Sequence, residues 1–302
     1  MIDIFVPTYM PDLKQIRVLM RSLDTYLEAR AVASLNIAAI GRAESFACVQ
    51  EVDTHKFASC TCYLRLQDLG FGEPDGSREQ GWSLQQAAKL GFARHATTEF
   101  YMVLDSKNIA LRPIRVADLV QDGRSPWVLG DVAIHPRWWR GSAWAMAHRK
   151  FNRTPGRQAL SAATPVIFHT ASVVAMLDWL ERYHGESVER FLMRRRPIRQ
   201  RFLRATEFTM YYVFMDREGL LDRYHFASNR LHDIPSQIWL DQPPQIRTER
   251  IRRILGGQVN GLFTGIQRAA WEALTEQECM GLHALAAGGR LNTQLMLGTD
   301  SC

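Results

Sequence analysis

The sequence is poor in cysteine and has no long apolar run, and these absences exclude several classes of protein. Its five cysteines match neither a disulfide framework nor a zinc pattern, and the only close pair is Cys60 and Cys62. We expect buried free thiols in a reducing compartment. The apolar runs are too short to span a membrane, and MIDIFVPTY leaves no room for a signal peptide. These features predict a cytoplasmic protein, with peripheral attachment at the inner membrane left open.

The chain also lacks internal repeats and low-complexity linkers. A hydrophobic fraction of 46% with 23% charged residues excludes disordered, collagen-like and coiled-coil proteins. The 302 residues are enough to bury a substantial core. We predict one α/β domain over residues 1–250 and a strand and helix extension over 251–302, whose tail frays from Gly288.

Strand and helix patterns alternate along the first third. The apolar run Ile2 to Pro7 predicts a strand buried on both faces, and Asp12 and Gln15 have the spacing of a capping box before an amphipathic helix. Ser83 and Gln86 repeat that spacing before a second helix. Further strands are expected at 35–40, 63–66, 100–104 and 127–134 and around Leu262, with helices at 172–184, 206–219 and 269–285. This order predicts a Rossmann-type mixed sheet flanked by helices.

Polar residues follow two of the predicted strands. Thr8 and Tyr9 end the first strand, and the run Asp105 to Asn108 follows the strand at 100–104. Open α/β sheets bind ligands at the carboxyl ends of their strands. Thr8 could hydrogen-bond a ribose or base and Tyr9 could stack on a base, although an ordinary turn would use the same residues.

Three motifs, Pro7-Thr8-Tyr9, Asp105-Ser106-Lys107 and Thr206-Glu207, occur in the order found in GT-A enzymes. Together with GWSLQQAAKLGFARHATTEFYMVLDSKN and TPVIFHTASVVAMLDWLE, the pattern resembles a little-characterised bacterial family of GT-A-type glycosyltransferases, from about Ile2 to about Leu240. The resemblance implies a GT-A-like fold and a nucleotide-sugar donor. It also implies a glycan or lipid-linked acceptor in bacterial surface polysaccharide synthesis.

The resemblance also implies roles for single residues in donor binding. Pro7, Thr8 and Tyr9 would hold the nucleotide. Asp105 to Lys107 stand where the family has a metal-binding Asp-x-Asp, but a lysine replaces the second acid. Either Asp105 binds Mn²⁺ or Mg²⁺ weakly, or Lys107 itself supplies the positive charge and Asp105 fixes hydroxyl groups. Ser106 and Asn108 complete this donor-binding set.

Glu207 is the candidate general base. An inverting transfer needs a carboxylate that takes the proton of the acceptor hydroxyl, whereas a retaining transfer does not. The alternative is a carboxylate that complements the helix dipole.

Lys89, on the helix before the Asp105 strand, could reach a phosphate or be a solvated side chain. His225 and His232 could be a third metal ligand, with a structural role as the alternative.

Positive charge is concentrated in one segment. The net charge is +6, and the segment Arg190 to Arg204 carries seven arginines and no acid, so the rest of the chain falls to −1. The interleaved apolar residues favour an anionic membrane surface or a pyrophosphate-linked lipid acceptor. A solvated loop or a subunit interface is the alternative.

Another motif is Arg137-Trp138-Trp139-Arg140, whose tryptophans could stack on a sugar or belong to the core.

Two other functions compete with glycosyl transfer. A nucleic-acid-binding protein would explain the basic segment but would leave the polar strand ends unused, and no helix-turn-helix, RNA-recognition or zinc signature accompanies it. A nucleotidyltransferase could use a similar sheet, but the first strand–helix turn has no Gly-rich phosphate loop. Nucleotide-sugar transfer is therefore the leading hypothesis.

Overall fold

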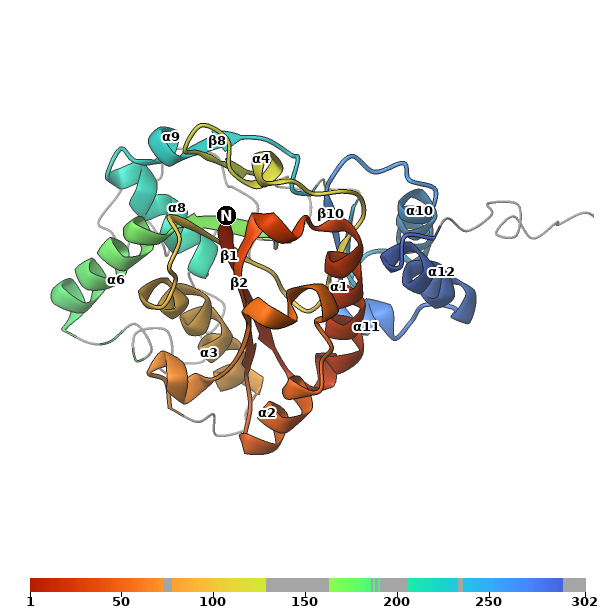
Figure 1. Cartoon of the computed structure of the whole chain (residues 1–302), viewed down its shortest axis with the longest axis horizontal. Helices are drawn as coiled ribbons and strands as arrows, with labels where there is room; N and C mark the ends of the chain where they lie inside the picture. Colours follow the sequence, from red (N-terminus) through yellow and green to blue (C-terminus); the bar gives the residue numbers. More distant parts are fainter. Residues whose placement is uncertain are drawn as a thin grey trace, which may run out of the picture.

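The computed structural model describes residues 1–72, 78–128, 163–185, 187, 190, 206–232 and 236–289, with the backbone alone for 78–80. Its central sheet has the order β3-β2-β1-β4-β7 (Figure 1). The strands are β1 (Ile2–Thr8), β2 (Val32–Ala39), β3 (Thr61–Arg65), β4 (Phe100–Val103) and β7 (Val166–His169). β7 runs antiparallel to β4, whereas the other pairs are parallel. The expected mixed sheet is confirmed.

Helices cover both faces of this sheet. They are α1 (Leu13–Tyr26), α2 (Ala43–Gln50), α3 (Arg78–Gly91), α6 (Thr170–His184) and α8 (Glu207–Arg217). In Figure 1, α1 and α2 lie on one side of the sheet, and α3, α6 and α8 lie on the other. Successive β1 side chains point to opposite faces, so Ile4 packs with α1 and α2 while Phe5 packs with α3, α6 and α8. Because both sides of β1 are buried, its continuous apolar pattern is explained.

Two smaller sheets extend the molecule. One has the order β5-β10-β9, formed by β5 (Asn108–Ala110), β10 (Phe263–Ile266) and β9 (Gln237–Ile238). The other pairs β6 (Ser125–Trp127) with β8 (His225–Ala227). The C-terminal part adds α10 (Pro244–Leu255), α11 (Arg268–Trp271) and α12 (Glu276–Ala286). The short helices α4 (Val116–Leu119) and α9 (Leu221–Tyr224) and 3-10 turns at 10–12, 29–31, 55–60, 66–69 and 92–94 complete the described elements.

Two helix ends agree well with the sequence. Thr206 caps α8, where its side chain accepts a hydrogen bond from the Thr209 amide, as predicted. Gly185 ends α6 with a φ of 67°, in the left-handed region that glycine enters without strain.

Several predicted details are wrong. Asp12 stands at the start of α1 but makes no capping bond, because its carboxylate pairs with Arg268. Ser83 lies inside α3, which begins five residues earlier, at Arg78. The predicted helix at 269–285 is interrupted between α11 and α12. Cys60 is half-buried and Cys62 is exposed, so the expectation of buried thiols is not met for this pair.

Other predictions fall outside the described residues. These are the strand beyond residue 128, the Arg137 to Arg140 stretch, the segment Arg190 to Arg204 except Arg190 itself, and the tail from 290. The division at residue 250 stays a prediction, and this position lies inside α10. Among the described helices, none has the length and apolar character that crossing a membrane requires.

Candidate active site

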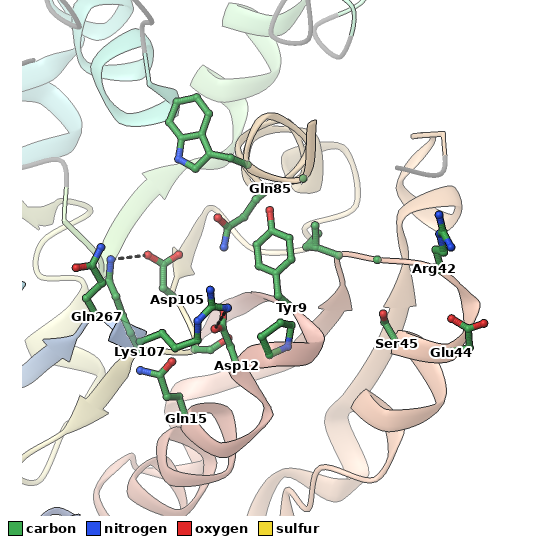
Figure 2. Close-up of a pocket in the computed structure, with 17 residues that line it drawn as sticks. Tyr9, Asp12, Gln15, Arg42, Glu44, Ser45, Gln85, Asp105, Lys107 and Gln267 are labelled. Atoms are coloured by element: carbon green, nitrogen blue, oxygen red, sulfur yellow. Dashed lines mark hydrogen bonds and ion pairs between the residues drawn. The ribbon is translucent and has the colours of Figure 1, made fainter. Parts of the chain in front are cut away.

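A pocket of about 630 Å³ opens at the carboxyl edge of the central sheet. β1 has β2 on one side and β4 on the other, so the chain connections diverge at this edge. Such switch points are the usual ligand sites of open α/β sheets. Five segments form its walls: the loop after β1, the start of α2, α3, the loop after β4 and the loop after β10 (Figure 2). The lining residues include Tyr9, Asp12, Gln15, Arg42, Glu44, Ser45, Gln85, Asp105, Ser106, Lys107, Gln267 and Arg268.

Tyr9 forms one wall and lies against α3. A Cβ atom at Gly81 would come within 3.1 Å of the Tyr9 ring, so the ring and the helix pack closely and a larger residue there would have to shift the ring. The Tyr9 hydroxyl is buried and has no hydrogen-bond partner among the described residues. Burial, with smaller effects of Asp12 and Asp105, raises the pKa of Tyr9 above its ordinary value. Tyr9 therefore offers the pocket a neutral aromatic ring.

Asp105 anchors the opposite wall through two lysines. Its Oδ1 lies 2.8 Å from Lys89 Nζ and its Oδ2 lies 3.0 Å from Lys107 Nζ. Thr164 Oγ1 also donates to Oδ2, at 3.0 Å. Burial raises the pKa of Asp105, but the two ammonium groups outweigh burial and hold the pKa well below its usual range. Asp105 is therefore ionised at neutral pH.

Lys89 connects Asp105 to the candidate base. Its Nζ lies 2.9 Å from Glu207 Oε1, and both side chains are 4% exposed. Burial lowers the pKa of Lys89, but the two carboxylates outweigh it and the net pKa is above the ordinary value. Burial raises the pKa of Glu207, and the neighbouring Lys89 offsets this only in part. The cluster thus contains a permanent cation and a carboxylate with raised proton affinity.

The predicted site residues separate into two groups. Tyr9, Asp105, Ser106 and Lys107 line the pocket, whereas Pro7, Thr8, Lys89, Asn108 and Glu207 do not. The ligand-binding and catalytic roles of both groups stay predictions.

Two members of the second group shape the loop after β4. Thr8 Oγ1 accepts a hydrogen bond from Ser106 Oγ at 3.1 Å. Asn108 Oδ1 accepts from the Asp105 amide at 2.8 Å, and its Nδ2 donates to the carbonyls of Thr164 and Thr264. These contacts fix the direction in which Asp105 and Lys107 point.

A divalent metal does not fit the residues around Asp105. Both carboxylate oxygens already face ammonium groups at 2.8–3.0 Å, and Mg²⁺ or Mn²⁺ is normally held by several oxygen ligands. Within the part of the chain that the structure describes, no three His, Cys, Asp or Glu side chains gather as a metal site.

The two histidines considered as metal ligands have other partners. His225 Nδ1 is 2.8 Å from Ser125 Oγ and its Nε2 is 2.7 Å from Tyr211 OH. Burial holds the pKa of His225 at about 3, so the ring is neutral. His232 Nε2 lies 3.1 Å from the Ala163 carbonyl. These contacts agree with the structural alternative.

Sequence reasoning missed one wall of the pocket. Arg42 and Ser45 stand at the start of α2, a helix that was not predicted, and Arg268 lies at the start of α11. Arg268 Nη1 contacts Asp12 Oδ1 at 3.2 Å, across 256 positions of sequence. No local pattern signals a contact over that separation.

Residues 5–267 match the model of a family of unknown function, DUF6492. The chain belongs to the DUF6492 family. No curated protein matches this DUF6492 chain significantly. Among solved structures, a crystal structure of the galactosyltransferase LgtC in complex with donor and acceptor sugar analogues is similar, with 12% identity and a TM-score of 0.49. The match covers 96% of this chain and 97% of LgtC. A likeness at this level carries no conclusion about activity.

Proposed function

We propose that the protein is a glycosyltransferase that takes a sugar from a nucleotide-sugar donor and transfers it to a glycan or lipid-linked acceptor. The observation that carries this proposal is the pocket at the switch point between β1 and β4. Its walls present the Tyr9 ring, on which a base could stack, and the Lys107 ammonium, which could contact a phosphate. This combination suits a nucleoside diphosphate better than an uncharged ligand.

The transfer exchanges one bond for another at the anomeric carbon. The acceptor oxygen forms the new bond, and the bond from the anomeric carbon to the donor phosphate breaks. The electron pair leaves with the nucleoside diphosphate, and the proton of the acceptor hydroxyl goes to a carboxylate. We assign that carboxylate to Glu207 and the reaction to the inverting type.

Two properties of Glu207 support its choice as base. Its pKa is raised, chiefly by burial, which strengthens it as a proton acceptor near neutral pH. The cap at Thr206 and the contact with Lys89 hold its backbone and side chain in place. Because Glu207 does not line the pocket, this assignment requires the acceptor to reach it from outside the donor cavity.

The cellular setting is part of the same proposal. The arginine-rich segment Arg190 to Arg204 would bind an anionic membrane surface or a pyrophosphate-linked lipid. Such a surface is where a bacterial surface polysaccharide is assembled from lipid-linked precursors. The proposal therefore places the protein in the cytoplasm, at the inner face of the membrane.

A calorimetric screen tests the proposed function. UDP-, GDP-, CMP- and dTDP-sugars are titrated into the full chain with and without Mn²⁺. We expect one nucleotide class to bind, and Tyr9→Ala to weaken this binding. Tyr183→Ala is the matched control, because Tyr183 is an exposed tyrosine on α6 that does not line the pocket. Binding by none of the nucleotides would overturn the proposal.

A further inference from the structure

We infer that Lys107 is the cation that binds the diphosphate of the donor, so that this site holds its ligand without a divalent metal. The inference rests on the proposed function and adds to it the group that neutralises the leaving nucleotide. Asp105, Lys89 and Lys107 carry the argument through their distances and their access to the pocket.

Two ammonium groups lie against the carboxylate of Asp105. Lys89 Nζ lies 2.8 Å from one carboxylate oxygen, and Lys107 Nζ lies 3.0 Å from the other. A divalent ion bound to either oxygen would lie next to an ammonium group, and like charges at such separations repel strongly where water is scarce. The side chain of Asp105 is only 16% exposed. The lysines therefore occupy the positions on Asp105 that a metal would need.

The two lysines differ in their access to the pocket. Lys89 Nζ contacts Asp105 and Glu207 and lies 5.0 Å from the centre of the Phe208 ring. Its side chain is 4% exposed and does not line the pocket. Lys89 is thus a positioning residue, which holds the Asp105 and Glu207 carboxylates.

Lys107 is placed differently. Its side chain is 19% exposed and lines the pocket. Its Nζ contacts Asp105 Oδ2 and lies 4.8 Å from the centre of the Trp239 ring. An ammonium group has three donors. Among the described residues Lys107 pairs with Asp105 and approaches the Trp239 ring, which leaves a donor for a ligand.

Two other cations, Arg42 and Arg268, also line the pocket. Arg268 Nη1 is paired with Asp12 Oδ1 at 3.2 Å. Arg42 stands at the start of α2, and Glu44, two positions later in the sequence, lines the same pocket wall. Lys107 lies in the loop between β4 and β5, at the sheet edge where a phosphate group is expected. When the bond between the anomeric carbon and the phosphate oxygen breaks, negative charge grows on that oxygen, and a fixed ammonium group beside it stabilises the charge.

Calorimetry on the full chain tests the inference. UDP, GDP, CDP and dTDP and the four matching nucleosides are titrated after dialysis against EDTA and again with Mn²⁺. The variants are Lys107→Met, which removes the charge, and Lys107→Arg, which keeps it. Lys14→Met is the control, because Lys14 is an exposed lysine at the start of α1 that does not line the pocket.

We expect the diphosphate to bind the native chain equally well in EDTA and in Mn²⁺. Loss of a charge-assisted hydrogen bond in Lys107→Met should weaken diphosphate binding about 10- to 100-fold. Binding of the matching nucleoside, which has no phosphate, should stay unchanged. Lys107→Arg should retain most of the diphosphate affinity, and Lys14→Met should bind as the native chain does.

Other outcomes separate failure of this inference from failure of the proposed function. If no nucleotide binds the native chain in either buffer, the proposed function is wrong. If the diphosphate binds only with Mn²⁺, or binds Lys107→Met as tightly as the native chain, the function stands and the inference is overturned. The EDTA comparison uses the native chain, so it decides the question even if Lys107→Met fails to fold.

Discussion

At the scale of single residues, Lys89 joins two carboxylates that come from distant parts of the chain. Asp105 follows β4 and Glu207 begins α8, yet both lie within 3 Å of the Lys89 ammonium group. Bringing three charges out of water is costly, so the cluster adds little net stability while all three are present. Removing Lys89, however, would leave Glu207 without its cationic partner and Asp105 with Lys107 alone, in a largely buried site.

Lys89→Met should therefore destabilise the protein strongly at neutral pH. Loss of one partner from a buried ion pair costs about 3–5 kcal/mol. The pKa of Glu207 is already raised in the native chain, and loss of Lys89 should raise it further above its unfolded value of about 4.3. The pKa of Asp105 should also rise, although Lys107 still lowers it. The folded variant then binds more protons than the unfolded chain, so its stability should increase as pH falls toward 5.

Urea unfolding of native and variant chains at pH 7.5 and pH 5 measures this effect. In the native chain the lysines lower the pKa of Asp105, so the contribution of Asp105 is present above its unfolded pKa and is lost only in stronger acid. Lys14→Met is again the exposed control. A loss of stability in Lys89→Met that is the same at both pH values would contradict the buried charge cluster.

Glu207→Gln tests the base. Gln keeps the size of the side chain and an oxygen that can accept from Lys89, but it cannot take up a proton. Removing a general base typically lowers turnover about 10²- to 10⁴-fold, while the donor affinity should be unchanged. The measurement is kcat beside the calorimetric Kd of the donor.

Glu218→Gln, at the other end of α8, is the matched control and should turn over normally. If Glu207→Gln also turns over at a near-normal rate, Glu207 is not the base. A retaining transfer, or another proton acceptor, would then be the better description of the reaction.

At the scale of helices, the packing of α3 against Tyr9 decides the width of the pocket. Gly81→Ala should add helix propensity, since Gly is about 1 kcal/mol less favourable than Ala inside a helix. The new Cβ would lie 3.1 Å from the Tyr9 ring and push it away from its present position. We expect nucleotide binding to fall while thermal stability is unchanged or slightly higher.

Tyr9→Phe is the companion variant for this test. The Tyr9 hydroxyl makes no hydrogen bond within the described part of the chain, so its removal should not lower the stability of the free protein. If Gly81→Ala binds nucleotide as well as the native chain, the Tyr9 ring does not form part of the binding wall.

The cap of α8 links helix stability to the site. Thr206→Ala removes the bond from the Thr209 amide, and loss of an N-cap costs about 1 kcal/mol. Thr275→Ala removes an equivalent cap from α12. Both variants should lose similar stability in urea unfolding, but only Thr206→Ala should reduce turnover, because Glu207 follows that cap directly. Equal turnover in the two variants would show that the α8 cap does not position the base.

The sequence predicted the elements that carry strong local patterns. β1 and β4 are apolar throughout, and α8 has a capping threonine, so these elements and the polar residues at their ends were found. α2 was missed because it has eight residues and no capping side chain. The Asp12 capping box was wrong because Arg268, 256 residues away, holds that carboxylate instead. Tertiary contacts of this kind leave no periodic signal in the chain.

At the scale of the whole molecule, the C-terminal part completes the pocket. β10 pairs with β5, which begins at Asn108, and places Gln267 and Arg268 beside Asp12. α12 packs on α1 (Figure 1). There the Tyr26 hydroxyl donates to the Leu285 carbonyl, and Thr25 Oγ1 donates to the Ala286 carbonyl. The pocket therefore depends on residues on both sides of the predicted boundary at position 250.

The charge distribution leads to a prediction for the full chain. The net charge of +6 comes from the segment Arg190 to Arg204, without which the chain carries −1. If this segment binds a membrane surface, the protein should sediment with vesicles containing phosphatidylglycerol and not with pure phosphatidylcholine vesicles. Each arginine near an anionic surface contributes about 1 kcal/mol, so replacing Arg194, Arg195 and Arg196 by Gln should weaken binding about 100-fold.

A second triple variant separates a local effect from one of net charge. Replacing Arg247, Arg252 and Arg253 of α10 by Gln removes the same three charges from another part of the chain. Binding to the anionic vesicles should then stay near the native level and should fall with added salt, because screening shortens the reach of exposed charges. If both triple variants lose binding equally, vesicle binding depends on the net charge of the protein and not on the segment Arg190 to Arg204. If the native chain fails to bind, the arginine segment serves another partner, and sedimentation with a pyrophosphate-linked lipid in neutral vesicles becomes the deciding measurement.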